Sequence, residues 1–571
     1  MTPPKGVIDQ IHQIFSKFFW GNYSGVKGKH WVDWSDMCYP KREGGIGFRS
    51  LVDISDALFA KLWWNFRTKT SLWSTFMWNK YCKKHHPTIT KNKGASQIWK
   101  KMMRIREEVE HEIWWQQKEG TARFWMDNWT KQGALYFTEP QGLNEEVEVK
   151  EMILNEQWNT SRLRQLISED KVECILENIN PRMKEKDKAW GMGNTQGEFT
   201  VKSAFQLIRR KKKEYEWRNN IWIKGLPFKI SFFLWRVWRK RIPTDDVLKK
   251  MKVYMVSKCY CCNVGEEETI QHIFQTAPIA QMLWNHFASC AGINIEGLHL
   301  QQLITTWWDW PAKHKLRQIL KAMPAIIMWE LWKRRNARRH GREVTYEKMK
   351  SQCHKTTQML LKVKYPWIKG GDQDWKDMIA ILNTYKPKLH FRVVHWDPPD
   401  ADWVTCNTDG ACRGNPGQSS YGFSIRDTKG DLIYAEAQCI GEATNMEAEL
   451  MGVWMALKYC ELQNFQKIIL EMDSLAIKNI ITKQWKTPWT HTEKMEDIQQ
   501  SITRKHVQVK HIFREANQLA DYLANMTFDR AEGVQAQSFY DLPSKGRRII
   551  NIDKHKIPTL RIKTRRIGTT S

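Results

Sequence analysis

The feature that most restricts the fold of this chain is a change of pattern after Ala401. From there, apolar runs of about four to eight residues, typical of β-strands, alternate with amphipathic helical segments. Three strands followed by alternating helices and strands indicate an α/β domain with a five-stranded mixed sheet. The predicted strands are 403–408, 421–426, 432–439, 467–472 and 507–513, and the predicted helices are 445–460 and 516–526.

Single carboxylates stand on these predicted elements. Asp409 ends the first strand, Glu449 lies in the first helix, Asp473 ends the fourth strand and Asp521 lies on the last helix. Each acid alone is more simply a cap, turn or surface residue. If the sheet brings them together, however, the four carboxylates form a cluster that is unfavourable unless divalent cations bind it. Two Mg²⁺ ions fit such a cluster, with Mn²⁺ as the alternative.

Net charge separates this segment from the rest of the chain. The 571 residues carry 90 Lys plus Arg against 62 Asp plus Glu, a formal charge of +28. Residues 400–526 hold 13 basic and 17 acidic residues, so the remainder carries +32. This surplus favours a polyanionic partner, most simply RNA or DNA, over a solvated basic surface without one. Basic bursts at 209–213 and 333–339 are the candidate phosphate contacts, with solvated helix faces or nuclear import signals as alternatives.

Composition excludes several other classes of protein. Mean hydropathy is −0.61, and no apolar run of about 18 residues occurs, so we expect no membrane association. No basic-then-apolar leader is found, so we expect a protein of the nucleus or, alternatively, the cytoplasm, and not a secreted one. Twelve Cys without regular spacing indicate reduced thiols. The 31 Trp lie mostly at helical spacings, which favours core packing over base stacking.

The sequence around the four acids resembles ribonuclease H. The match comprises the run TDGACRGNPG at 408–417, Tyr421-Gly422, Ala443-Thr444-Asn445, Asp473-Ser474, and Asn517 four residues before Asp521. The resemblance implies endonucleolytic, metal-dependent hydrolysis of the RNA strand of an RNA–DNA hybrid by a two-metal-ion mechanism. It assigns Asp409, Glu449, Asp473 and Asp521 as the metal ligands. Glu447 is the alternative to Glu449, and the spacing from Thr444 favours Glu449.

The resemblance also implies the substrate contacts, with departures. Asn415, Thr444 and Asn445 match the family positions that contact 2′-hydroxyls and a phosphate of the hybrid. Met446 and Leu475 stand where the family carries polar contacts, which predicts weaker hybrid recognition.

A mobile histidine assists product release in the family. His511 lies ten residues before Asp521, which is the family spacing. The alternatives are that His511 is a structural strand residue and that Arg514 faces the phosphate instead.

A second set of residues has the types that bind zinc. Cys259-x₂-Cys262 followed by His272 offers thiolate and imidazole ligands. With Leu226-Pro227, Phe233, Trp235-Arg236, Leu248, Glu267 and Trp284, these residues resemble the zinc-binding domain of plant retroelement reverse transcriptases. Ala277 stands where that family carries its fourth ligand, and Cys261 and His286 are the candidate substitutes. We favour a weakened or lost zinc site over an intact one.

The N-terminal sequence resembles the region after the polymerase active site of plant LINE-type retroelements. The matching landmarks are Phe19-Trp20-Gly21, Trp31, Trp34, Pro40-Lys41, 44–47, Ala57-Leu58, 61–63, 124–129 and 329–336. The palm of a polymerase carries an aromatic-x-Asp-Asp element. The single Asp-Asp here, Asp245-Asp246, has Pro243 at the aromatic position, so we expect no reverse transcriptase activity.

Together these patterns predict a multi-domain chain. We expect a helical reverse transcriptase remnant at 1–130, a connection at 131–194, a zinc-knuckle-like domain at 195–295 and a helical region at 296–384. A linker at 385–399, a ribonuclease H-like domain at 400–530 and a basic flexible tail at 531–571 follow. The predicted function is a Mg²⁺-dependent ribonuclease H that binds RNA–DNA hybrids. The alternative is a catalytically inactive retroelement remnant that only binds nucleic acid.

Overall fold

A computed structural model of the chain forms two compact units. It describes residues 4–21, 30–83, 85–91, 94–139, 144–179, 181, 186–253, 255–262, 265–368, 374–387, 389–529 and 533–564. One unit contains residues up to 56 together with 208–388, and the other contains residues 57–207 together with 389–564. No described helix combines the length and the apolar character needed to cross a membrane.

A mixed sheet lies at the centre of the ribonuclease H-like part of the second unit. Its strand order is β10-β9-β6-β7-β8-β11. β6 to β8 form an antiparallel meander, and β9 and β10 run parallel to β6. The predicted number of five strands was wrong, because β11 adds a sixth strand beside β8. The strands are β6 (Val404–Gly414), β7 (Gly417–Arg426), β8 (Leu432–Ala443), β9 (Lys467–Met472), β10 (His506–His511) and β11 (Val534–Ala536).

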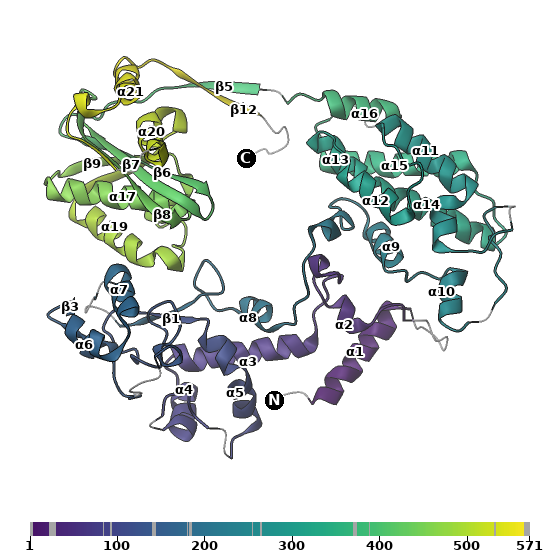
Figure 1. Cartoon of the computed structure of the whole chain (residues 1–571), viewed down its shortest axis with the longest axis horizontal. Coiled ribbons are helices and arrows are strands. Elements are labelled where there is room, and N and C mark those ends of the chain that lie inside the picture. The colour runs from purple at the N-terminus through teal and green to yellow at the C-terminus, as the bar shows by residue number, and fades with distance from the viewer. Residues whose placement is uncertain are drawn as a thin grey trace. The chain divides into compact units, whose positions relative to one another are not determined.

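Helices cover both faces of this sheet (Figure 1). Two glycines permit the close packing. A Cβ at Gly410 would lie 2.2 Å from the backbone nitrogen of Glu449 on one face, and a Cβ at Gly422 would lie 2.5 Å from the backbone nitrogen of Ala524 on the other. The helices are α17 (Asn445–Leu462), α18 (Leu475–Ile481), α19 (Thr492–Arg504) and α20 (Gln518–Met526).

The segment expected to be a flexible tail is folded where the structure describes it. Residues 533–564 form β11, α21 (Ser544–Lys554) and β12 (Thr559–Thr564), while 531–532 and 565–571 lie outside the described residues. The expected linker at 385–399 was also wrong in part, because β5 (Leu389–Val394) pairs antiparallel with β12. The physical reason is burial, since Ile549 and Ile550 of α21 pack into an apolar cluster with Ala435 and Leu519.

A buried ion pair fixes α21 to the sheet. Arg426 of β7, whose side chain is 1% exposed, donates to Asp553 of α21 at 2.6 Å. The same guanidinium donates to Asn407 at 2.8 Å, and the Trp396 ring lies over it with its centroid at 3.4 Å. The pKa of Asp553 is raised because burial outweighs the opposing effect of Arg426. The C-terminal extension is therefore part of the core of this domain.

Residues 57–207 have a core of their own. The stretch 131–194, expected to be a connection, contributes Leu135, Val149, Leu163 and Val172 to this apolar cluster. Its elements are α3 (Leu51–Thr68), α4 (Leu72–Met77), α5 (Gln97–Glu110), β1 (Ile113–Gln116), β2 (Ile153–Leu154), β3 (Gln157–Trp158), α6 (Thr160–Leu166), α7 (Glu169–Asn178), β4 (Lys188–Gly191) and α8 (Val201–Ile208).

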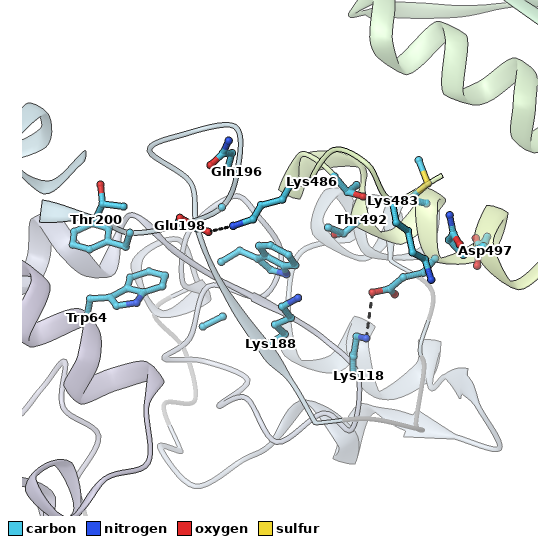
Figure 2. A pocket seen from close by; sticks show the side chains of 18 of the residues that line it. Trp64, Lys118, Lys188, Gln196, Glu198, Thr200, Lys483, Lys486, Thr492 and Asp497 are labelled. Atoms are coloured by element: carbon cyan, nitrogen blue, oxygen red, sulfur yellow. Dashed lines mark hydrogen bonds and ion pairs between the residues drawn. The ribbon is translucent and has the colours of Figure 1, made fainter. Parts of the chain in front are cut away.

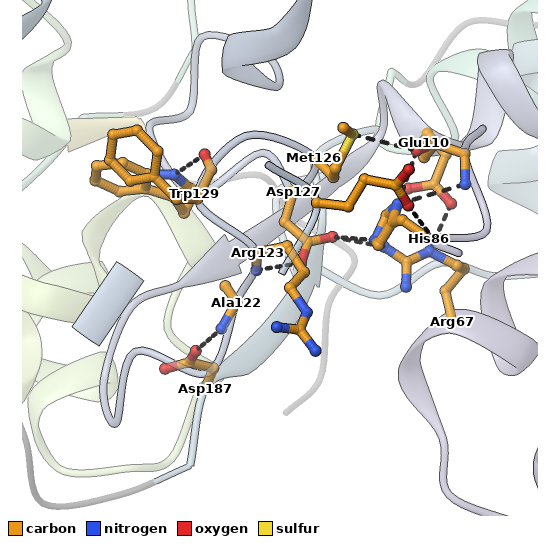
Figure 3. Close-up of polar contacts among 12 residues, drawn as sticks. Arg67, His86, Glu110, Ala122, Arg123, Met126, Asp127, Trp129 and Asp187 are labelled. Atoms are coloured by element: carbon orange, nitrogen blue, oxygen red, sulfur yellow. Dashed lines mark hydrogen bonds and ion pairs between the residues drawn. The ribbon is translucent and has the colours of Figure 1, made fainter. Parts of the chain in front are cut away.

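Buried charges also organise this segment, as Figure 3 shows. The Arg67 guanidinium donates to Glu110 at 2.7 Å and to Asp127 at 2.6 Å. Burial alone would raise the pKa of Asp127, but Arg67 and His86 hold it well below its usual range. Asp187 accepts hydrogen bonds from the amides of residues 118, 120 and 122 at 2.7, 2.9 and 2.7 Å. The aromatic landmark at 124–129 is thus a packed core around one buried carboxylate.

The first unit is mainly helical. Trp284, Trp307 and Trp308 are almost completely buried in its core, as their helical spacing predicts. Its helices are α1 (Lys5–Phe19), α2 (Trp34–Met37), α9 (Phe228–Trp238), α10 (Asp245–Lys250), α11 (Pro278–Ala291), α12 (Leu300–Asp309), α13 (His314–Leu320), α14 (Met323–Arg339), α15 (Tyr346–Lys364) and α16 (Trp375–Thr384).

The basic bursts, expected to contact phosphate, are used largely for internal pairing. Arg209 binds the buried Glu43 at 2.6 Å. Arg334 donates to the Cys261 carbonyl at 2.9 Å, and the Arg335 Nε donates to buried Glu268 at 3.0 Å. Because Arg334 and Arg335 are buried, these two arginines of α14 stabilise the fold and are not exposed phosphate contacts.

The Arg426–Asp553 pair generates a stability prediction. We expect Asp553→Ala to lower the free energy of unfolding of the ribonuclease H-like part by about 3–5 kcal/mol, because it leaves a buried guanidinium uncompensated. Urea unfolding of the full chain, followed by tryptophan fluorescence, measures the effect. The control is Asp400→Ala, which removes an exposed carboxyl, and equal unfolding midpoints for the two variants would contradict the structural role of the tail.

Candidate active site and metal centres

Three of the four predicted acids meet at one edge of the sheet. Carboxylate oxygens of Asp409, Glu449 and Asp473 lie within 4.8 Å of one another. Asp409 comes from β6, Glu449 from the second turn of α17, and Asp473 follows β9 directly. Asp409 and Glu449 are 5% and 8% exposed. Such a set of hard oxygen donors fits a divalent cation such as Mg²⁺.

Local packing determines this convergence. The missing side chain at Gly410 lets α17 approach β6, so that Glu449 lies beside Asp409. β9 runs parallel to β6, with Thr408 paired to Met472, so Asp409 and Asp473 follow at the same end of neighbouring strands. Thr444 begins α17 as the N-cap, with its hydroxyl accepting from the Glu447 amide at 3.3 Å.

The pKa values of the three carboxyl groups are raised, which indicates that nearby positive charge does not compensate for their burial and mutual repulsion. Burial is the main cause that raises the pKa of Asp409 to about 9, with Asp473, Glu449 and Asp521 adding to it. Burial, followed by Asp473, raises the pKa of Glu449 to about 8. The Asp473 pKa is also raised by burial, although Arg514 and His511 oppose the shift. Near neutral pH, protons must leave this cluster when a cation binds.

Asp521, His511 and Arg514 lie around the triad. Asp521 on α20 is 28% exposed and forms an ion pair with Arg514. Asn517 donates to the Thr408 carbonyl at 2.9 Å, which fixes the start of α20 beside β6. His511 ends β10, and its Nε2 lies 3.1 Å from the Asp473 carbonyl oxygen. The structure therefore places all three residues close enough to act on the Asp473 carboxylate, while Asp521 is outside the converging triad and the predicted roles of the three residues stay predictions.

The predicted substrate-contact residues gather at the start of α17. The Asn415 side-chain oxygen accepts from the Asn445 amide at 3.2 Å, so the β6–β7 hairpin contacts the helix terminus. The Asn445 side chain lies 3.4 Å from Glu449. Glu447 instead closes a capping box with Thr444, accepting from its amide at 2.8 Å. Glu447 therefore caps the helix, whereas Glu449 lies beside Asp409 in the carboxylate cluster.

The two departures from the family pattern differ in their setting. Met446 is half-buried and packs against the apolar core under the sheet. Leu475, in the first turn of α18, is 51% exposed. Neither side chain can donate a hydrogen bond to a hybrid.

The Cys–His cluster also converges. The ligand atoms of Cys259, Cys262 and His272 lie within 4.8 Å of one another. The Cys262 sulfur is 3.2 Å from His272 Nε2, and His272 Nδ1 is 2.6 Å from Glu266. A carboxylate on the second ring nitrogen is the usual arrangement of a zinc-bound histidine. These residues fit Zn²⁺ with three ligands.

The suggested fourth ligands lie outside this triad among the described residues. Cys261 is buried, and its amide donates to the Cys259 sulfur at 3.3 Å. His286 packs on Phe287 with ring centroids 5.0 Å apart, and burial lowers its pKa. Ala277 is 1% exposed, and its amide donates to the His272 carbonyl at 2.9 Å. The family position of the missing ligand is therefore adjacent to the cluster.

Two family models match the chain. The family described as zinc-binding in reverse transcriptase matches residues 199–284, and the family described as reverse transcriptase-like matches residues 407–527. This order confirms the predicted retroelement-type architecture.

Individual relatives agree with these matches. A provisionally named ribonuclease H protein of Arabidopsis thaliana is 24% identical over 93% of this chain and 86% of its own length. A ribonuclease H of Chromohalobacter salexigens is 30% identical over 24% of this chain and 92% of its own length. Among solved structures, LC11-RNase H1 in complex with an RNA/DNA hybrid is 32% identical, covers 22% of this chain and 98% of its own, and has a TM-score of 0.21.

The position of Ala277 generates a metal-binding prediction. We expect the parent protein to bind Zn²⁺ weakly, because a structural zinc site is closed by four ligands. Ala277→Cys should raise the affinity at least about 10-fold, since it adds a thiolate beside His272. Competition with a chromophoric chelator measures both affinities. Ala280→Cys on α11 is the control for an added thiol, and a gain of the same size in that variant would contradict this geometry.

Proposed function

The chain belongs to the ribonuclease H family, and from this premise we propose that it hydrolyses the RNA strand of RNA–DNA hybrids with Mg²⁺. The observation that carries the proposal is the convergence of Asp409, Glu449 and Asp473 at one sheet edge. In the reaction, a water oxygen bonds to phosphorus and the P–O3′ bond breaks. The products are a 5′-phosphate and a 3′-hydroxyl.

The chain's own residues divide the work of this reaction. When bound, two Mg²⁺ ions supply charge stabilisation to the attacking and leaving oxygens. Asp409, the most buried of the three carboxylates, would hold both ions, with Glu449 and Asp473 completing the set. These side chains come from a strand, a helix and a strand end, so their positions are fixed before substrate arrives. Asp521 would hold the more labile ion.

Arg514 and His511 are proposed to act on phosphate and product. Arg514 is 65% exposed, and its partner Asp521 faces the same cluster. If Asp521 held a cation, its carboxylate would no longer occupy the Arg514 guanidinium, which would then be available to a substrate phosphate. His511 would assist departure of the product.

Recognition of the hybrid is assigned to the hairpin and helix terminus. Asn415 and Asn445 are exposed polar side chains, and Thr444 is the N-cap of α17, the helix that carries Glu449. Their amide and hydroxyl groups can read the 2′-hydroxyl that distinguishes RNA from DNA. Met446 and Leu475 remove two polar contacts, so we expect weaker binding than a ribonuclease H with both contacts.

The competing function is binding of nucleic acid without hydrolysis. The observations that favour it are Met446, Leu475 and the incomplete zinc set at Ala277. In that case the acidic edge would persist as a fold feature, and the protein would bind a hybrid in a salt-sensitive manner without cleaving it.

Activity distinguishes the two functions. We expect the parent to cleave a labelled RNA–DNA hybrid in Mg²⁺, and Asp409→Asn and Glu449→Gln each to lower kcat at least about 100-fold, since each removes a metal-binding carboxylate. The control is Glu447→Gln, which alters the cap of α17 and should cost about 1 kcal/mol of stability with little effect on kcat. Salt-sensitive binding by all four proteins without cleavage by the parent would establish the competing function.

The raised carboxyl pKa values predict how stability depends on pH. In the folded state without metal, Asp409 and Glu449 keep their protons to about pH 9 and 8, whereas the unfolded chain releases them near pH 4. The folded state therefore binds more protons between these limits, and its stability falls as the pH rises through this window.

Thermal unfolding in EDTA at about pH 5 and pH 9 tests this dependence. We expect a lower Tm at the higher pH, partial recovery by Mg²⁺ mainly at the higher pH, and a flatter profile for Asp409→Asn. A parent profile that does not change when Mg²⁺ replaces EDTA would argue against a metal site formed by these carboxylates.

A further inference from the structure

A large cavity lies in the second unit, and none of the three carboxylates of the sheet edge lines it. Its volume is about 1330 Å³, and it lies between residues 61–201 and the segment 483–500. Small-molecule sites usually measure about 300–1,000 Å³. The size of this cavity, which we call the lysine groove, favours an extended ligand over a compact one.

Lysines from separate parts of the chain enter the groove. Lys61 comes from α3, Lys118 follows β1, Lys188 lies on β4, and Lys483 and Lys486 follow α18. Figure 2 shows Lys118 and Lys188 on one side and Lys483 and Lys486 on the other. Lys188 and Lys483 are exposed, and exposed ammonium groups are suited to contact a phosphate backbone.

Two of these lysines form ion pairs with acids of the groove, one at an exposed position and one at a buried lysine. Glu198 pairs with Lys486, and Glu496 lies 3.3 Å from Lys118. The side chains of Lys486 and Glu198 are 68% and 50% exposed, so their ion pair contributes little to stability. A phosphate oxygen can therefore replace the Glu198 carboxylate on Lys486 at small cost.

The wall of the groove is apolar in part, and this favours an unpaired strand over a duplex as its ligand. Trp64 and Phe199 are 6% and 3% exposed and stack on each other beneath the wall, with ring centroids 4.9 Å apart. Trp190 is only half-buried, and its ring lies under the Lys188 ammonium group at 3.9 Å. A duplex keeps its bases paired and inside, so only an unpaired strand can place bases against such a wall.

The groove is close to the proposed catalytic edge. α18 begins two residues after Asp473, and Lys483 follows its last residue by two positions. At about 1.5 Å per residue, this helix is about 10 Å long. A strand that leaves a bound hybrid therefore has to cross only a short distance to reach Lys483.

We propose that the lysine groove binds an unpaired RNA or DNA strand that continues from a hybrid at the carboxylate edge. The link to a hybrid rests on the proposed function, whereas binding of the strand itself does not. Lys188, Lys483 and Lys486 contact the phosphates, and the half-buried Trp190 contacts a base.

The test is direct binding of labelled oligothymidylate and oligouridylate of about 12 nucleotides, a length within the usual range of single-strand sites. The full chain carries Asp409→Asn, so that binding is measured without cleavage. We expect the Lys188→Glu/Lys483→Glu double variant to bind at least about 10-fold more weakly, with a salt slope reduced by about 1.4, since each phosphate contact contributes about 0.7. Glu198→Gln should bind more tightly, because it removes the internal competitor of the phosphate.

The matched control is Lys429→Glu/Lys458→Glu, which makes the same charge change at two exposed lysines of the same unit outside the groove. An equal loss of affinity in both double variants would overturn the proposal, as would the absence of strand binding by the parent. Displacement of the strand by polyglutamate as readily as by unlabelled strand would also overturn it. Unequal binding of the two oligonucleotides identifies whether the RNA or the DNA strand is the ligand.

A separate readout keeps this proposal apart from the proposed function. If the parent cleaves a blunt-ended hybrid but the affinity for the single strand is the same in the parent and the groove variants, the groove proposal alone fails. If strand binding responds to the variants but no hybrid is cleaved, the proposed ribonuclease activity alone fails.

Discussion

The contact between α17 and β6 at Gly410 is the constraint from which the acidic edge follows. A side chain there would lie 2.2 Å from the Glu449 backbone nitrogen, so the helix could not approach the strand. The approach buries Asp409 and Glu449 against each other and raises both pKa values above neutrality. Burying the two carboxyl groups destabilises the domain without metal, and it does so at the place where a cation can bind.

The positions of five strands along the chain and the identity of the three converging carboxylates could be predicted from the sequence, because each acid directly follows or interrupts a recognisable apolar run. The C-terminal extension could not be predicted in this way. Its helix α21 is basic, and the side chains that it buries are those of Ile549, Ile550 and Asp553. The partner of Asp553 is Arg426, 127 residues away, and no local pattern reveals a pair so distant.

The same limit applies to the positive charge. A run such as 333–339 has the composition of a phosphate-binding segment, yet Arg334 and Arg335 are buried beside the Cys–His cluster, where they bind a carbonyl and Glu268. Conversely, Lys188 and Lys483 lie in no basic run and are brought to one groove only by the fold. Charge counted along the sequence therefore predicts a polyanionic partner, but tertiary structure determines which cations face it.

These two uses of charge require different physical environments. A buried guanidinium such as Arg426 contributes to the fold only while its carboxylate partner remains, because the lone charge in the interior is costly. An exposed lysine such as Lys486 exchanges partners cheaply, because water compensates each change. The bidentate geometry of guanidinium suits the paired interior positions of Arg335 and Arg426, and the strong hydration of ammonium suits the exposed lysines of the groove. This distribution separates the cations that hold the protein together from those able to contact nucleic acid.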